Sequence, residues 1–207
     1  SPGGYYRKAL GKTADGRRVV QDYYQDSNTP QTAPFTLKKD ADPRDYTTGA
    51  VDGKITWYRP DGSILAIQQY RNGAPISRLN HYRDGRLAVQ SEQPAGVAET
   101  DDPYSSAGEA SQGSRYYYAS GQLLALEYGR NDLPCGNHDC EWTILYDNNG
   151  QPLAAYHGER TNDIVLHKYW NTLNHTPADE QTARRQTFDA ALERLDELRQ
   201  MQQQDGL

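Results

Sequence analysis

The chain has 207 residues, with 28 acidic and 22 basic side chains and a formal net charge of −6 at pH 7. Binding to duplex nucleic acid usually needs a basic excess, because counterion release from phosphates drives it, so this charge argues against general nucleic-acid binding. Only 35% of the residues are hydrophobic, yet 16 are tyrosines, whose rings bury apolar area while their hydroxyls stay in water. The composition predicts a thin sheet with partly covered faces rather than a thick apolar core.

Residues 1–18 are taken as an N-terminal segment without an assigned element. The sequence begins SPGGYYRK, which is typical of a processed start, and it contains no run of 18 apolar residues, so we expect no transmembrane span. A targeting segment or an acylated Cys just before Ser1 stays open. We therefore expect the periplasm or cell envelope, with lipid anchoring as one form of this, and the cytoplasm as the alternative.

Residues 19–174 repeat one short pattern. An aromatic residue, two to four polar residues, Gly, one further residue and then Ile, Leu or Pro recur in WYRPDGSILAIQQY, HYRDGRLAVQ, YYASGQLLALEY and LYDNNGQPLAAYHG, with a degenerate first copy in YYQDSNTPQTAPFTL. The glycines that hold the same place are Gly62, Gly85, Gly121 and Gly150. Asp-Gly and Asn-Gly between alternating apolar runs indicate β-hairpins with primed turns, and YRNGAPIS (70–77) joins one hairpin to the next.

These residues resemble MORN-variant repeats of the kind found in YwqK-like bacterial antitoxins: a Tyr-x-x-x-Gly-x-Leu hairpin followed by Tyr-x-Asn-Gly. The resemblance covers roughly residues 19–160 and is best over 55–90 and 114–158. LYDNNGQPLAA also resembles a YD repeat, more weakly. The resemblance implies an elongated, twisted antiparallel sheet used for binding, and it brings no catalytic residues. Together with the repeats, it predicts an all-β meander of about nine or ten strands.

The repeats supply candidate binding residues. Aromatic side chains and arginines interleave along them, and both types are common at interaction hot spots. Consecutive tyrosines at 116–118 must alternate between the two faces of a strand, so at least one face presents Tyr. We predict a binding surface made by Trp57, Tyr58, Arg59, Arg71, Tyr82, Arg83, Arg86 and Tyr117.

Charge is unevenly distributed around this surface. Residues 54–90 hold six basic and two acidic side chains, whereas the first insertion, 91–113, holds five acidic and no basic ones and lacks a strand period. We interpret the insertion as a surface loop. Either the basic sheet binds an acidic partner, or the loop folds back over it, or these are ordinary solvated charges.

The second insertion, 129–142, contains the two cysteines of the chain, Cys135 and Cys140. Their spacing at a hairpin tip suits a disulfide, which would indicate an oxidising compartment. Two free thiols are an alternative. A metal site formed by both cysteines and His138 is a further one, but three ligands fall short of the four that structural zinc requires. We predict the disulfide and no metal.

The segment 175–207 changes to a helical pattern. Thr176 suits an N-cap, Pro177 suits the first helical position, and residues 163–170 alternate like a last strand. Helical spacing also places one apolar stripe along the segment, made by Phe188, Ala191, Leu192, Leu195, Leu198 and Met201. The stripe either packs on the sheet or binds another chain, for example as a dimer seam.

The sequence lacks the common catalytic, nucleotide-binding and metal-binding motifs. Asp61, Asp84 and Asp147 each lie close to a turn Gly, and turn chemistry explains them. We therefore expect a non-enzymatic protein-binding module without cofactor, of antitoxin or immunity type. The alternative is an envelope lipoprotein that binds glycan or cell-wall components through an aromatic sheet face, and an enzyme is the weakest hypothesis.

Overall fold

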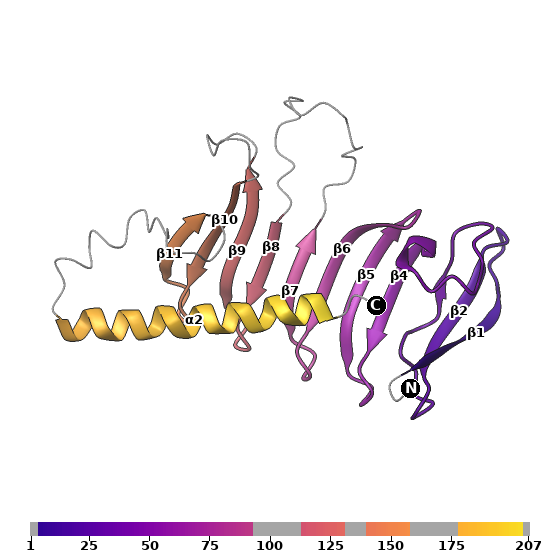
Figure 1. Ribbon diagram of the computed structural model, residues 1–207, viewed down its shortest axis with the longest axis horizontal. Coiled ribbons are helices and arrows are strands. Elements are labelled where there is room, and N and C mark those ends of the chain that lie inside the picture. The colour runs from indigo at the N-terminus through magenta and orange to yellow at the C-terminus, as the bar shows by residue number, and fades with distance from the viewer. Residues whose placement is uncertain (1–3, 93–112, 131–139, 158–177, 205–207) are drawn as a thin grey trace. The chain divides into compact units, whose positions relative to one another are not determined.

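The computed structural model describes residues 4–92, 113–130, 140–157 and 178–204 (Figure 1). The chain divides into two compact units. The first spans Ser1–Gln93 with Gln204–Leu207, and the second spans Pro94–Gln203. Each unit is described by itself.

The first unit contains a three-stranded sheet in the order β1-β2-β3 and four further strands, β4 to β7, each antiparallel to the next. A short 3-10 helix, η1, lies between β3 and β4. The bounds are β1 Tyr5–Lys12, β2 Arg18–Tyr24, β3 Phe35–Thr36, η1 Thr48–Ala50, β4 Gly53–Tyr58, β5 Ile64–Arg71, β6 Ala74–His81 and β7 Leu87–Glu92.

The second unit contains four strands, again each antiparallel to the next, and one helix: β8 Gly113–Tyr117, β9 Leu123–Arg130, β10 Cys140–Tyr146, β11 Pro152–His157 and α2 Ala178–Gln204. The predicted all-β meander of repeated hairpins with a C-terminal helix is confirmed. The strand predicted at 163–170 lies outside the described residues, as does the Thr176 cap.

One strand was not foreseen. β1 lies inside the segment 1–18, to which no element was assigned, and it pairs with β2 through a turn at Gly16. The Thr13 amide donates to the Arg17 carbonyl at 2.9 Å, and the Gly16 amide donates to the Thr13 carbonyl at 2.9 Å. The signal was present, because Asp15-Gly16 stands between two strand-like runs.

The repeated glycines close four identical turns, but these turns are not the primed type that was predicted. In each turn the residue three before the Gly donates its amide to the carbonyl one after it, as Arg59 does to Ser63 at 2.8 Å. The glycines have φ between 79° and 88°, and the residues before them keep negative φ. This is a three-residue loop with Gly in the left-handed region. A primed turn does occur at Asn72-Gly73, where both φ values are positive, 51° and 86°.

Each of the four repeats also carries a β-bulge at the same place. The register shifts so that an extra residue sits three positions after the turn Gly. The residues concerned are Leu65, Ala88, Leu124 and Leu153. Because the bulge recurs at the same position, the repeat in the sequence is also a repeat in backbone geometry. Each bulge adds local twist to its strand.

Side chains next to the turns bond one hairpin to the following one. Arg59 Nη2 donates to the carbonyl of His81 at 2.6 Å. In the second unit the hydroxyl of Tyr118 donates to the carbonyl of Tyr146 at 2.8 Å. Arg59 and Tyr118 both stand three residues before a turn Gly, and both acceptors stand four residues before the next one. This position therefore sets the spacing between neighbouring hairpins.

The core of the first unit joins the small sheet to β4 and β5. Buried side chains from both parts pack together, among them Val20, Phe35, Leu37, Ile55 and Trp57. The indole Nε1 of Trp57 donates to Gln68 Oε1 at 3.0 Å, and the Tyr70 hydroxyl donates to the same oxygen at 2.9 Å. The polar atoms of the buried rings are thus satisfied inside the core.

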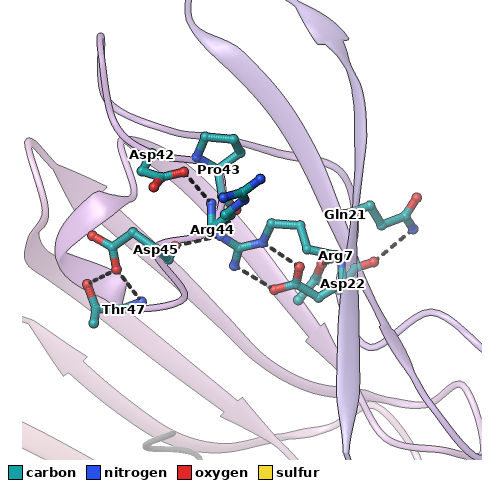
Figure 2. A network of polar contacts seen from close by, with 9 residues as sticks. Arg7, Gln21, Asp22, Asp42, Pro43, Arg44, Asp45 and Thr47 are labelled. Carbon is teal, nitrogen blue, oxygen red and sulfur yellow. Dashed lines mark hydrogen bonds and ion pairs between the residues drawn. The ribbon is translucent and has the colours of Figure 1, made fainter.

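A buried ion pair fastens the small sheet to the segment before η1 (Figure 2). Arg7 and Asp22 lie opposite each other on β1 and β2, and the guanidinium contacts both carboxylate oxygens, at 2.6 and 2.8 Å. It also donates to the Asp45 carbonyl at 2.7 Å and lies over the rings of Phe35 and Tyr46. These contacts link β1 and β2 to the segment before η1.

The apolar stripe of α2 is buried in the second unit. Ala191, Leu195 and Leu198 are 2%, 0% and 0% exposed, and the other stripe residues are half-buried. Arg199 Nε donates to Glu127 of β9 at 2.9 Å, and the Tyr116 hydroxyl of β8 bonds Gln202 at 3.2 Å. The helix thus packs on the sheet face formed by β8 and β9, which is one of the two predicted outcomes for the stripe.

Candidate binding surface

Side chains of β4 to β7 alternate between two faces of the sheet. Trp57, Ala66, Asn80 and Val89 lie in one row across the four strands and are all buried. We call this the covered face. The residues between them point to the opposite side, where most side chains keep part of their surface exposed. We call this side the open face.

Two rows of side chains cross the open face. The pairs Tyr58–Ile64 and His81–Leu87 lie next to the turns, and Thr56, Ile67, Leu79 and Gln90 follow as the second row. Most of these side chains are half-buried, and the two rows contain no charged carboxylate. We define the apolar strip as Tyr58, Ile64, Ile67, Leu79, His81 and Leu87.

Basic residues lie along both margins of the apolar strip. Lys54 and Arg71 are exposed on the side away from the turns. Arg83 and Arg86 are exposed at the turns, where they pair with Asp61 and Asp84 respectively. These arginine–aspartate pairs are solvent-exposed, so each contributes little to stability. The margin with Lys54 and Arg71 is therefore net positive, whereas Asp61 and Asp84 balance the arginines at the turns.

His81 is the one strip residue that titrates near neutral pH. Burial lowers the pKa of its imidazole below the usual 6.5, and the positive charge of Arg59 lowers it further. The side chain is therefore neutral at pH 7 and adds apolar area to the strip.

The predicted binding residues fall into three groups. Trp57 and Tyr82 are 7% and 8% exposed and belong to the interior, because the strand alternation and the turns direct their rings inward. Arg59 bonds the carbonyls of Ile64 and His81, at 2.6 Å each, and so serves the joining of the hairpins. The residues that reach a surface are Tyr58 in the strip, Arg71, Arg83 and Arg86 at its margins, and Tyr117, half-buried in the second unit.

The aliphatic part of the strip was missed. The sequence analysis weighed aromatic and arginine residues and did not single out Ile64, Ile67, Leu79 or Leu87. Alternation could have indicated Ile67 and Leu79, which adjoin buried Ala66 and Asn80. Ile64 and Leu87 stand two residues before buried Ala66 and Val89, and they reach the open face only through the bulges at Leu65 and Ala88. A face is assigned only once register and bulges are known.

Two predicted features cannot be placed. Cys135 lies outside the described residues, so the Cys135–Cys140 disulfide stays a prediction. Most of the acidic insertion 91–113 also lies outside them, so its interpretation as a surface loop stays a prediction. Among the described residues, no group of three or more His, Cys, Asp or Glu side chains is arranged to hold a metal ion. The one described α-helix is not long and apolar enough to cross a membrane.

Comparisons with known proteins add little. A scan against protein-family models and a search of curated proteins find no match to this chain. Among solved structures, the crystal structure of a GtfA/B complex bound to UDP and GlcNAc is similar at 9% identity over 76% of this chain and 25% of that chain, with a TM-score of 0.27. A TM-score this low carries no argument about fold or function.

Proposed function

We propose that the chain is a non-enzymatic protein-binding module of antitoxin or immunity type, and that it binds its partner through the open face of β4–β7. The observation that carries the proposal is the apolar strip with its basic margins. Flat, partly exposed apolar area with rigid aromatic and basic side chains is the usual make-up of a protein interface. The resemblance to MORN-variant repeats supports the same class.

Charge supports an acidic partner. The open face and its margins expose Lys54, Arg71, Arg83 and Arg86 against Asp61 and Asp84, in a chain whose formal net charge is −6. A locally positive surface on an otherwise negative protein steers an acidic partner to that surface and orients it there. The association rate should therefore fall with added salt.

The repeated carboxylates do not favour an enzyme. Asp61 accepts bonds from the hydroxyl and the amide of Ser63, and Asp84 accepts bonds from the Arg86 side chain and amide. These bonds lower the pKa of both carboxyl groups. A general acid needs a raised pKa, so these groups act as turn caps rather than proton donors.

The experiment is affinity capture from a lysate of the source organism with three versions of the protein. The wild type is compared with the strip variant Ile67→Asp/Leu79→Asp and with a control, Gln186→Asp, at an exposed helix position. Circular dichroism verifies that all three fold. We expect one stoichiometric partner that the strip variant loses and the control keeps. A partner that both variants retain would sink the proposal.

The glycan alternative is tested in the same preparation. Trp57, the ring with the largest stacking area in the described part of β4–β7, is buried, so glycan stacking would depend on half-buried tyrosines such as Tyr58. Titration with cell-wall fragments should leave the tryptophan fluorescence unchanged. Quenching at millimolar glycan, abolished by Tyr58→Ala, would favour the glycan-binding lipoprotein instead.

A further inference from the structure

The second unit demonstrates how a sheet of these repeats accepts a helix. Helix α2 runs across β9 and β8, since Arg199 contacts Glu127 and Gln202, three residues later, contacts Tyr116 (Figure 1). Leu195 and Leu198 are fully buried there, and an ion pair lies at the flank. The row that α2 covers contains Tyr116 and Ala125, which occupy the same repeat positions as Trp57 and Ala66 of the covered face. Helix α2 therefore shows how a helix is held on that face, by an apolar row and a charged margin.

The apolar strip lies on the opposite face of such a sheet, and it has the dimensions for a helix of its own. It crosses four strands at a spacing of about 4.8 Å, so it is about 14 Å long. Its two rows are separated by two residues of strand, about 7 Å. A helix rises about 1.5 Å per residue and is about 10 Å wide, so about ten residues of helix match this area.

We propose that the open face of β4–β7 binds an amphipathic helix of the partner protein, laid across the strands, with acidic residues on the flank of its apolar stripe that faces Lys54 and Arg71. This rests on the proposed function and names the element that the partner supplies. The apolar residues of the helix contact Ile64, Ile67, Leu79 and Leu87. Its acidic flank faces Lys54 and Arg71, and its other flank faces the turns, where Arg83 and Arg86 pair with Asp61 and Asp84.

A β-strand fits this unit less well. Strand addition needs a free sheet edge, and the outer edge of β4 already bonds the segment before β3: the Ala33 amide donates to the Thr56 carbonyl at 2.9 Å, and the Tyr58 amide donates to the Gln31 carbonyl at 2.8 Å. The strip also runs across the strands, whereas an added strand would run along them. A helix uses the face without disturbing either feature.

The test uses two stapled helical peptides of about 14 residues. Both carry leucines at helical spacing on one face. One has Glu along one flank of this face, and the other has Lys at the same positions. Binding to the full chain is measured by calorimetry, and the site is mapped by amide shifts in two-dimensional NMR. We expect the Glu peptide to bind at least about tenfold more tightly than the Lys peptide and to shift amides of β4–β7.

Two variants make the result decisive. Leu79→Asp should abolish binding of the Glu peptide. Lys54→Glu/Arg71→Glu changes only exposed side chains, so the fold is retained, and it should reverse or remove the preference between the peptides. Equal binding of both peptides, binding that survives Leu79→Asp, or no binding at about 1 mM overturns the inference.

The two proposals fail in different ways. If the captured partner is lost by the strip variant but cross-links to the open face through a strand or loop, the binding function stands and the helix inference is wrong. If a glycan or a second copy of the chain occupies the open face, the helix inference is wrong as well. If no partner depends on the strip, the proposed function itself fails.

Discussion

The buried ion pair between Arg7 and Asp22 offers the sharpest test of the fold. The side chain of Arg7 is 7% exposed and that of Asp22 is 0% exposed, so water can replace neither partner. In Asp22→Asn the guanidinium keeps its bond to the Asp45 carbonyl but loses the compensating charge. Breaking a buried pair in this way typically costs about 3–5 kcal/mol of unfolding free energy.

Urea denaturation followed by circular dichroism measures this loss. With a slope of about 2 kcal/mol per M, the midpoint for the first unit should fall by about 2 M. The double variant Arg7→Met/Asp22→Leu leaves no buried charge, so it should be more stable than Asp22→Asn. Its remaining cost is the unpaired Asp45 carbonyl, about 1–3 kcal/mol.

The control is an ion pair that water can reach. Arg194 and Glu197 lie three residues apart on α2, with side chains 36% and 54% exposed, so Glu197→Gln should cost less than about 1 kcal/mol. The reasoning is refuted if Asp22→Asn costs no more than this control, or if the double variant is less stable than the single one. Either result would mean that the ion pair is not desolvated as its burial indicates.

Three further predictions concern single residues. Gly73→Ala should lower the free energy of unfolding by at least about 2 kcal/mol, because φ is +86° and the new Cβ would lie 2.2 Å from a backbone oxygen. Gly62→Ala, at φ +83° with open space around the new Cβ, should lower it by only about 1–2 kcal/mol, and equal losses in urea denaturation would contradict this reasoning. Tyr116→Phe removes the 2.7 Å hydrogen bond to the Glu127 carboxylate, so the free energy of unfolding should fall by about 1–3 kcal/mol. Because burial raises the pKa of Tyr116, the variant should also lose one phenol that titrates at high pH in a spectrophotometric titration, and an unchanged titration curve would refute the assignment. Burial lowers the pKa of His81, so as the pH falls through 6.5 the unfolded chain binds this proton first, and the free energy of unfolding should drop until the folded His81 is protonated as well. His81→Gln should remove this part of the pH dependence. Identical slopes of unfolding free energy against pH for both proteins, between about pH 7.5 and 5.5, would count against the prediction.

The local features of this protein could be predicted from the sequence. Turn glycines, alternating runs and a helical stripe depend on the conformational preferences of a few neighbouring residues, so they indicated the hairpins, their order and the helix. Ala191, Leu195 and Leu198 were assigned to one stripe from spacing alone, and they are buried together. Nearby residues also carried the signal for β1, in Asp15-Gly16, although it was not used.

The turn type needed the structure. Asp-Gly is compatible both with a two-residue primed turn and with a three-residue loop that ends in a left-handed Gly, and the choice depends on the register of the strands. That register, with its bulge at the third residue after each Gly, also decides which side chains share a face. Sequence spacing alone placed Trp57 and Tyr58 together on a surface, and the fold placed Trp57 in the core.

The candidate site depends on tertiary structure for the same reason. Arg59 reaches the carbonyl of His81, 22 residues later, only because neighbouring hairpins lie side by side. The apolar strip likewise combines residues from four strands, none of which is distinctive by itself. The sequence determined which elements form, since this is a matter of local backbone energetics, whereas the packing of those elements decided which side chains remained available to a partner.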